Sequence, residues 1–259
     1  MIGPTTENRR FVNCPSVTAL DYGDQIPVCD CCNQFTAMCC LHYGKACHHH
    51  RVFFADGACL NNGKEGARAG VGVAGGENKH FQVSTPFSDL VGDGNGSKRT
   101  NQIAELRAAI EAVAFIEGLC KANKGDGKTK SQSSHRSKRR KLYVPVEEDD
   151  EAEYEKDEDE DKDEDGKNKA TLCIIAMDSE YVVKGMTAWF PMWRKHGWKT
   201  SKGNTPANLD LFLALEREIC RVEDRGWNIR ICFWWVPREH NKVADRLAKN
   251  AAQLDTGED

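Results

Sequence analysis

A short apolar segment that ends on an acid constrains this chain more than any other feature. Val52, Phe53 and Phe54 are β-branched or aromatic, which favours a buried strand, and Asp56 follows them closely. A carboxylate within an apolar strand is costly unless a cation or a donor compensates its charge. A lone Asp-Gly pair is most often a strand-end turn. We expect a chemical role for Asp56 because three later segments also place an acid at an element end, namely Glu105, Asp178 and Asp245.

The distribution of charge predicts that one domain is interrupted by an insert. The 259 residues carry a net charge of -4, which hides strong segregation. Residues 121–141 hold nine Lys or Arg and one acid, whereas residues 147–165 hold fifteen acids and two Lys. Residues 121–169 are too poor in apolar side chains to form a core, so we expect a disordered insert. The acidic tract could bind a basic protein partner.

The hydropathy and the cysteine content of the sequence narrow the cellular compartments in which we expect the protein. The sequence has no run of 18 apolar residues and no secretory signal, so we expect neither a membrane span nor secretion. Twelve Cys in such a chain favour reduced thiols or metal ligands over disulfides. Residues 137–141 form a basic cluster of the kind found in nuclear import signals. We therefore expect the protein in the nucleus, the cytoplasm or both.

A dense group of Cys and His precedes the first strand. Residues 1–28 are polar and predicted to be flexible, and residues 29–50 are rich in thiols and imidazoles. Such ligands suit tetrahedral zinc, although the spacing is not that of a standard finger. The alternative is a set of small, half-buried side chains without a metal. The candidate zinc ligands are Cys29, Cys31, Cys32, Cys39, Cys40, His42, Cys47 and His48.

Periodicity predicts an α/β fold with a mixed sheet flanked by helices. The expected strands cover residues 51–59, 69–74, 80–84, 172–177 and 228–236. The expected helices cover residues 101–120, 179–189, 209–225 and 241–252, with a basic, aromatic stretch at 191–204 and a tail at 254–259. The first three strands are predicted to be antiparallel. One domain, interrupted by the insert, would then span residues 51–253.

Several motifs in this order resemble type 1 ribonuclease H of the eukaryotic kind, over residues 51–120 and 170–253. The resemblance implies a ribonuclease H-like fold with five strands, three antiparallel and then parallel ones. It also implies an endonuclease that hydrolyses the RNA strand of RNA–DNA hybrids. The motifs are Asp56-Gly-Ala-Cys59, Asn61-Asn-Gly63, Arg68-Ala-Gly-Val-Gly-Val73, Thr100-Asn-Gln-Ile-Ala-Glu105, Met177-Asp-Ser179, Gly197-Trp-Lys-Thr200 and Asn241-Lys-Val-Ala-Asp245.

The resemblance also implies a metal-dependent mechanism. Asp56, Glu105, Asp178 and Asp245 would hold two Mg²⁺ ions about 3.5–4 Å apart, and Mn²⁺ could substitute. One ion would activate a water and the other would stabilise the leaving 3′ oxygen. The products would carry a 5′ phosphate and a 3′ hydroxyl. Four acids gathered without cations repel one another, which disfavours a purely structural role for the set.

A substrate surface follows from the same resemblance. Asn62, Asn101 and Gln102 would contact RNA 2′ hydroxyls, the groups that distinguish RNA from DNA. The residues expected at the DNA strand are Thr100, Asn208, Tyr181, Trp189 and Trp193. Residues 194–202, including Thr200 and Ser201, form a basic stretch with aromatics, suited to backbone contact. The alternative is an ordinary solvated loop with Trp198 in the core.

Two departures from the family pattern concern the site. Ile103 stands where a basic residue is common, which could weaken a phosphate contact. The loop Val236-Pro-Arg-Glu-His240 is shorter than usual, so that His240 or Arg238 could replace the usual loop His. His240 could equally be a helix-start residue without a role. The competing functions are a catalytically weak nucleic-acid-binding module and an interaction protein built on the acidic tract. We expect a monomer.

Overall fold

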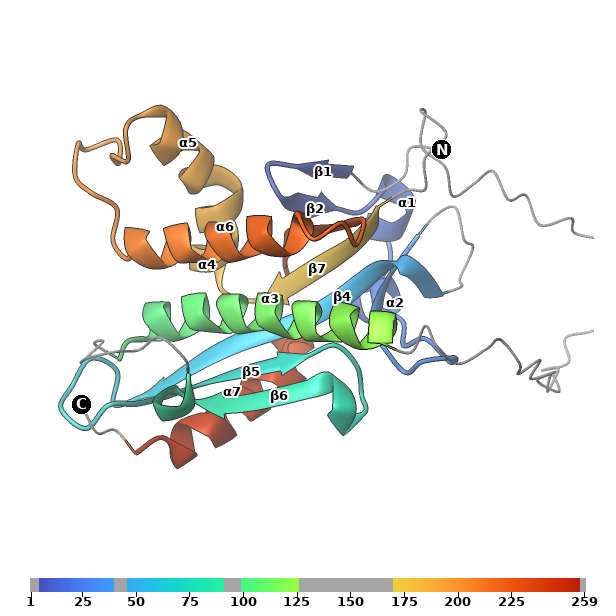
Figure 1. The fold of residues 1–259 in the computed structure, drawn as a ribbon, viewed down its shortest axis with the longest axis horizontal. Helices are drawn as coiled ribbons and strands as arrows, with labels where there is room; N and C mark the ends of the chain where they lie inside the picture. Colours follow the sequence, from blue (N-terminus) through green and yellow to red (C-terminus); the bar gives the residue numbers. More distant parts are fainter. Residues whose placement is uncertain (1–4, 40–45, 91–98, 126–169, 257–259) are drawn as a thin grey trace, which may run out of the picture.

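The computed structural model describes residues 5–39, 46–90, 99–125 and 170–256. A twisted sheet forms the centre, with α3 and α6 on one face and α7 on the other (Figure 1). The sequence-predicted insert lies mostly outside the described residues, as does the end of the tail. Among the described residues, no helix is both long and apolar enough to cross a membrane.

Five strands form the main part of the sheet in the order β6-β5-β4-β7-β8, with β6 at one edge. β4 pairs antiparallel with β5, and β5 pairs antiparallel with β6. β7 runs parallel to both β4 and β8. This arrangement confirms the predicted α/β fold class. The strands span Ala46–Leu60 (β4), Arg68–Ala74 (β5), Gln82–Pro86 (β6), Thr171–Met177 (β7) and Ile229–Trp235 (β8).

The start of the chain differs from the flexible segment that the sequence predicted. β1 (Thr5–Glu7) and β2 (Arg10–Val12) extend the sheet beyond β8, and β3 (Thr36–Met38) pairs with β4. Two short helices lie between them, α1 (Pro15–Thr18) and α2 (Tyr22–Gln25). The side chain of Arg9 explains part of this order, because it forms ion pairs of 2.9 and 3.0 Å with Glu216 and Glu223. These long-range contacts are invisible in a local hydropathy pattern.

Two helical segments on the first face run further than predicted, whereas α6 ends two residues earlier than predicted. They are α3 (Asn101–Gly125), α4 (Glu180–Lys184), a π-helical turn (Gly185–Trp189), α5 (Phe190–Lys195) and α6 (Leu209–Glu223). Residues 121–125, predicted to belong to the insert, continue α3. An ion pair of 2.9 Å between Lys121 and Glu117, one turn apart, supports this end. The predicted loop at 191–204 begins as helix α5, which ends at Lys195.

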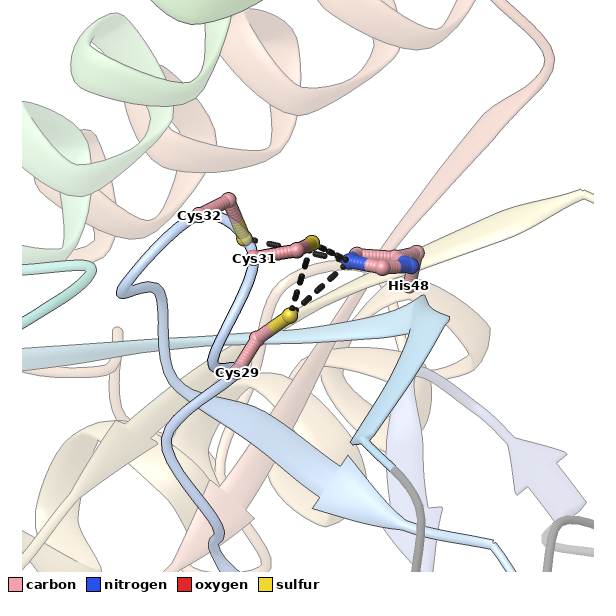
Figure 2. A group of neighbouring side chains, drawn as sticks. All are labelled: Cys29, Cys31, Cys32 and His48. Atoms are coloured by element: carbon pink, nitrogen blue, oxygen red, sulfur yellow. Dashed lines mark hydrogen bonds between the residues drawn. The ribbon is translucent and has the colours of Figure 1, made fainter. Parts of the chain in front are cut away.

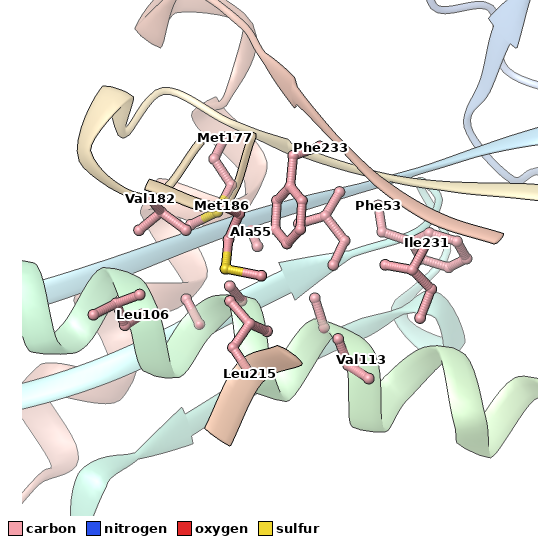
Figure 3. Packing of buried hydrophobic residues seen from close by; sticks show 14 of the residues in the cluster. Phe53, Ala55, Leu106, Val113, Met177, Val182, Met186, Leu215, Ile231 and Phe233 are labelled. Carbon is pink, nitrogen blue, oxygen red and sulfur yellow. The ribbon is translucent and has the colours of Figure 1, made fainter. Parts of the chain in front are cut away.

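Alternation along the strands divides the core into two layers. Phe53, Ile231 and Phe233 face the helices, where they meet Leu106 of α3 and Leu215 of α6 (Figure 3). Burial of each large side chain of this kind contributes about 1.5–3 kcal/mol. The opposite face of the sheet holds a second cluster, which contains Val52, Phe54, Ile174, Phe11 and Phe35.

The second face is covered from both ends of the chain. Phe11, Phe35 and Ala37 come from the N-terminal segment, and Ala244 comes from α7 (Lys242–Leu254). Short 3-10 turns occur at Lys79–Phe81, Phe87–Asp89 and Arg238–His240. The turn at Arg238–His240 joins β8 to α7 and therefore lies at the sheet end that carries the acids.

Candidate active site

Four acids from four different elements meet at one end of the sheet. Asp56 lies on β4 and Asp178 directly follows β7. Phe54 pairs with Ala176 across the two parallel strands, so Asp56 and Asp178 reach the same level two residues further on. Glu105 lies in the first turns of α3 and Asp245 in the first turn of α7. The four elements that the sequence predicted therefore converge.

Two glycines allow the helices to approach the strands closely. A Cβ at Gly57 would lie 2.1 Å from the backbone carbon of Ala104, beside Glu105. A Cβ at Gly72 would lie 2.3 Å from the carbonyl oxygen of Ala244, beside Asp245. Such contacts are far too short for any other residue. Because Gly57 and Gly72 have no side chain, the helices that carry Glu105 and Asp245 can lie directly against the sheet.

The electrostatics of the site are those of crowded carboxylates. Burial raises the pKa of Asp56, and the charges of Asp178 and Asp245 raise it further, to about 7. Burial also raises the pKa of Glu105 well above its ordinary value, with Asp56 and Asp178 adding to the effect. Oε2 of Glu105 is buried and has no hydrogen-bond partner among the described residues. A set of hard oxygen donors that repel one another fits a divalent cation such as Mg²⁺.

Asn241 and two cations surround the acids. The side-chain amide of Asn241 donates hydrogen bonds of 2.8 Å to Oδ1 of Asp178 and 3.1 Å to the carbonyl oxygen of Ala55. Arg238 forms an ion pair of 2.8 Å with Asp245, and its other terminal nitrogen lies 3.8 Å from Asp178. Lys249 contacts the second oxygen of Asp245 at 2.8 Å. These contacts orient two of the four carboxylates.

Of the two residues proposed for the short loop, Arg238 is the one that contacts the acids. The ring of His240 stacks on Tyr22 of the N-terminal segment, with centroids 5.3 Å apart. Sequence reasoning included Asn241 in a motif but gave it no role. An Asn before a helix is usually a cap, and the complete burial of this one becomes visible only in the structure.

The polar residues predicted to contact RNA gather at the start of α3. Oδ1 of Asn62 accepts a hydrogen bond of 3.0 Å from the backbone N–H of Asn101. The hydroxyl of Thr100 accepts one of 3.3 Å from the N–H of Ile103. Asn101 and Gln102 are exposed. The structure therefore places the predicted RNA contacts Asn62, Asn101 and Gln102 in one patch, together with Thr100 from the set predicted for the DNA strand.

The predicted DNA-strand residues form a second patch over α4, α5 and α6. Trp189 lies between Tyr181 and Trp193, with ring centroids 6.0 and 6.1 Å apart. The side-chain amide of Asn208 donates a hydrogen bond of 3.0 Å to the hydroxyl of Tyr181. The π-helical turn ends at Trp189, whose side chain remains exposed. Turns of this kind frequently occur at functional sites.

Some residues of the basic stretch at 194–202 are exposed to solvent, and others are held by contacts with the rest of the domain. Trp198 is half-buried against Phe190, with rings 5.3 Å apart, which agrees with the structural alternative for this residue. The hydroxyl of Thr200 accepts a hydrogen bond of 3.2 Å from the N–H of Asn204, and Ser201 is exposed. Arg194 pairs with Glu216 at 3.2 Å.

A separate group of soft ligands lies in the N-terminal segment. The ligand atoms of Cys29, Cys31, Cys32 and His48 all lie within 4.8 Å of one another, so this group could hold a metal ion. Cys39 is buried and lies outside the group. Cys40, His42 and the side chain of Cys47 lie outside the described residues, as do both charged tracts of the insert from residue 126 onward.

The comparisons with known proteins agree on one family. The family model described as RNase H matches residues 164–253, which include Asp178 and Asp245. The ribonuclease H of Schizosaccharomyces pombe is 27% identical over 207 residues, which cover 80% of this chain and 54% of that protein. Ribonuclease H1 of Homo sapiens is 26% identical, with 78% and 50% covered. The chain thus spans about half the length of these eukaryotic relatives.

A bacterial relative is matched over nearly its whole length. The ribonuclease H of Actinobacillus pleuropneumoniae is 26% identical over 211 residues, which cover 80% of this chain and 92% of that protein. Among solved structures, LC11-RNase H1 in complex with an RNA/DNA hybrid covers 78% of this chain and 96% of its own, at 17% identity and a TM-score of 0.40. The α/β fold is defined by the strand order and the strand directions of the sheet itself.

Proposed function

We propose that this chain, which is similar to ribonucleases H over about 80% of its length, is an endonuclease that hydrolyses the RNA strand of RNA–DNA hybrids. One observation carries the proposal. Asp56, Glu105, Asp178 and Asp245 converge from four elements, and burial, together with the charges of neighbouring acids, raises the pKa of both Asp56 and Glu105. Buried, mutually repelling acids in a site of this kind are expected where cations and a phosphate bind.

The donor set supports Mg²⁺ as the cofactor, with Mn²⁺ as a possible substitute. All four residues offer carboxylate oxygens, and Asn241 fixes one oxygen of Asp178 at 2.8 Å. When bound, two such ions supply a nucleophile from water and neutralise charge at the leaving oxygen of an in-line displacement. The expected products carry a 5′ phosphate and a 3′ hydroxyl. The thiols and imidazole of the Cys/His group are softer ligands and form a separate site.

The residues around the acids have distinct proposed tasks. Asn241 and Arg238 hold Asp178 and Asp245 in position. Asn62, Asn101 and Gln102 present amides at the start of α3, where they recognise the RNA 2′ hydroxyls. Tyr181 and Trp189 offer ring faces and edges to the sugar–phosphate chain of the DNA strand.

Parallel cleavage assays test this proposal. The purified chain is incubated with an RNA–DNA hybrid, double-stranded RNA and double-stranded DNA, each with Mg²⁺ and with a chelator. We expect cleavage of the hybrid alone, in its RNA strand, and only with the metal. Asp56→Asn should reduce the rate by orders of magnitude, whereas Asp210→Asn, at an exposed acid of α6, should not. Retained cleavage by Asp56→Asn, or equal cleavage of double-stranded RNA, would contradict the assignment.

A further inference from the structure

The Cys/His group joins two segments that are distant in sequence. Cys29, Cys31 and Cys32 come from one turn, and His48 comes from the beginning of β4 (Figure 2). Nε2 of His48 lies 3.0 Å from the sulfur of Cys29, 3.1 Å from that of Cys31 and 3.8 Å from that of Cys32. The sulfurs of Cys29 and Cys31 lie 3.1 Å apart. Four ligand atoms thus surround one point.

These distances are close to those of a tetrahedral zinc site. Zinc bonds of about 2.3 Å to sulfur and about 2.0 Å to nitrogen place two sulfurs about 3.8 Å apart and a sulfur and a nitrogen about 3.5 Å apart. To reach this geometry, the distances among Cys29, Cys31 and His48 would need to lengthen by less than about 1 Å, and the distance from His48 to Cys32 would need to shorten slightly. Three thiols and one imidazole also form one of the common closed ligand sets for structural zinc.

The backbone of the turn is shaped to hold the sulfurs together. Val28 and Phe35 form a β-bridge at its base, and the N–H of Cys29 donates a 2.9 Å hydrogen bond to the carbonyl of Gln34. The N–H of Asn33 donates a 2.7 Å hydrogen bond to the carbonyl of Cys29, and Asn33 has a left-handed φ of 56°. A tight turn with fixed hydrogen bonds holds the three sulfurs on the side facing His48.

Backbone N–H groups of Cys31 and Cys32 also donate hydrogen bonds to the sulfur of Cys29. Thiolates are the form that binds metals. Donors aimed at a ligand sulfur are a common supporting feature of metal sites. A disulfide would involve only two of the sulfurs and would not explain why the third thiol and the imidazole lie beside them.

We propose that Cys29, Cys31, Cys32 and His48 bind one Zn²⁺ ion, which fastens the N-terminal segment to the beginning of β4. The site is distinct from the acidic one. His48 and Asp56 lie eight positions apart on β4, a distance of about 26 Å along an extended strand. The proposed zinc is therefore structural, and its ligand set is closed to substrate.

The structure indicates what this attachment stabilises. The N-terminal segment packs on the second face of the sheet, where Phe11 lies 5.4 Å from Trp234 and Phe35 lies 5.3 Å from Phe54, between ring centroids. Tyr22 of the same segment stacks on His240. Three-residue strands and four-residue helices provide little stability on their own. A metal that closes the chain between residues 29 and 48 would lower the entropy of the unfolded segment.

Metal analysis of the full chain tests the proposal. The protein is purified under reducing conditions without chelators, and zinc is measured by elemental analysis. We expect about one zinc per chain in the wild type. Cys29→Ser and His48→Ala should lose it, whereas Cys59→Ser, which changes a half-buried thiol of β4 outside the group, should retain it. Zinc retained at wild-type level by both ligand variants would overturn the proposed ligands.

A second measurement covers variants that fail to fold. Wild-type protein stripped of metal is titrated with Co²⁺, and the visible spectrum is recorded. We expect sulfur-to-cobalt charge transfer and the d–d bands of a tetrahedral site at one equivalent, together with slower hydrogen exchange at residues 29–39. A wild-type protein that contains no zinc and gives no such spectrum would overturn the proposal. Asp56→Asn should keep its zinc, so the result is independent of the proposed nuclease activity.

Discussion

Asn241 donates a hydrogen bond of 2.8 Å from its side-chain amide to Oδ1 of Asp178. The same nitrogen contacts the carbonyl oxygen of Ala55, the residue directly before Asp56, and the whole residue is buried. One amide therefore joins the start of α7 to the interior of β4 and to the residue that follows β7. The relative position of the two strand acids depends on this contact.

Replacement of Asn241 should impair catalysis more than substrate binding. In Asn241→Ala the carboxylate of Asp178 loses its donor, and we expect kcat on a hybrid to fall at least tenfold with little change in KM. The free energy of unfolding should fall by about 1–3 kcal/mol, because buried polar partners are left unsatisfied. Asn250→Ala, at an exposed position of the same helix, is the control. Equal kinetics for Asn241→Ala and the wild type would show that Asn241 does not position Asp178.

Loss of Arg238 should change the response of the protein to metal. Arg238 pairs with Asp245 at 2.8 Å and is largely exposed, with 70% of its side chain accessible. We expect Arg238→Ala to lower the metal-free stability by only about 0–1 kcal/mol. Because a cation no longer competes for the acids, the Mg²⁺ concentration for half-maximal cleavage should fall.

Two variants separate charge from shape in that experiment. Arg238→Lys keeps the positive charge and should retain a Mg²⁺ requirement close to that of the wild type. Arg217→Ala removes a charge from an exposed position on α6 and should have no effect. A rise in the Mg²⁺ requirement of Arg238→Ala would indicate that Arg238 assists metal binding instead of competing with it.

Glu117 should make stability depend on pH below its unfolded pKa. Hydrogen bonds from Arg221 lower the pKa of this carboxyl from 4.5 to about 2, with Lys121 contributing and burial opposing the shift. A depressed carboxyl pKa stabilises the fold above the unfolded value, and this stabilisation is lost as the pH falls from about 4.5 toward 2. Glu117→Gln should lower the free energy of unfolding at pH 7 by about 1–3 kcal/mol.

Chemical denaturation of Glu117→Gln at a series of pH values checks this expectation. The variant should show a flatter dependence on pH than the wild type between pH 4.5 and 2. The control is Glu180→Gln, which removes an exposed pair with Lys184 one turn away and should cost only a few tenths of a kcal/mol. Parallel pH curves for Glu117→Gln and the wild type would contradict the assigned role.

The acidic tract at residues 147–165 should weaken hybrid binding at low salt. Its fifteen acids repel phosphates and attract the basic stretch at 194–202. Replacement of the tract by a neutral Gly/Ser segment of equal length should tighten hybrid binding, with little change in kcat. The effect should fade as salt rises, because charges are screened within about 10 Å at 0.1 M. Weaker binding by the neutral variant would favour the alternative that the tract recruits a basic partner.

The basic cluster at residues 138–141 provides a separate test in cells. We expect the neutralised variant Lys138→Ala, Arg139→Ala, Arg140→Ala, Lys141→Ala to accumulate less in the nucleus than the wild type. Fluorescence microscopy of tagged full-length chains measures the ratio between nucleus and cytoplasm. An unchanged ratio would show that this cluster is not an import signal.

The strands β4 to β8, the main helices and the positions of the four acids were predictable because each has a strong local signal. Alternation fixes the two faces of β4, as Phe53 and Phe54 show by entering different core clusters. A carboxylate after an apolar strand marks Asp56 and Asp178 without any knowledge of their neighbours. The motif order then indicated the resemblance to ribonuclease H, since the spacing of motifs is a property of the chain alone.

Contacts between distant segments required the tertiary structure. The sequence offered eight candidate zinc ligands, and among those that the structure describes, three-dimensional proximity groups Cys29, Cys31, Cys32 and His48. The sequence did not decide whether Arg238 or His240 replaces the usual loop His. In the structure Arg238 contacts the acids, whereas His240 stacks on Tyr22. The order of residues 5–25 and the burial of Asn241 follow from partners that lie far along the chain. Local patterns report propensity and periodicity, whereas these features depend on which surfaces meet after the sheet has formed.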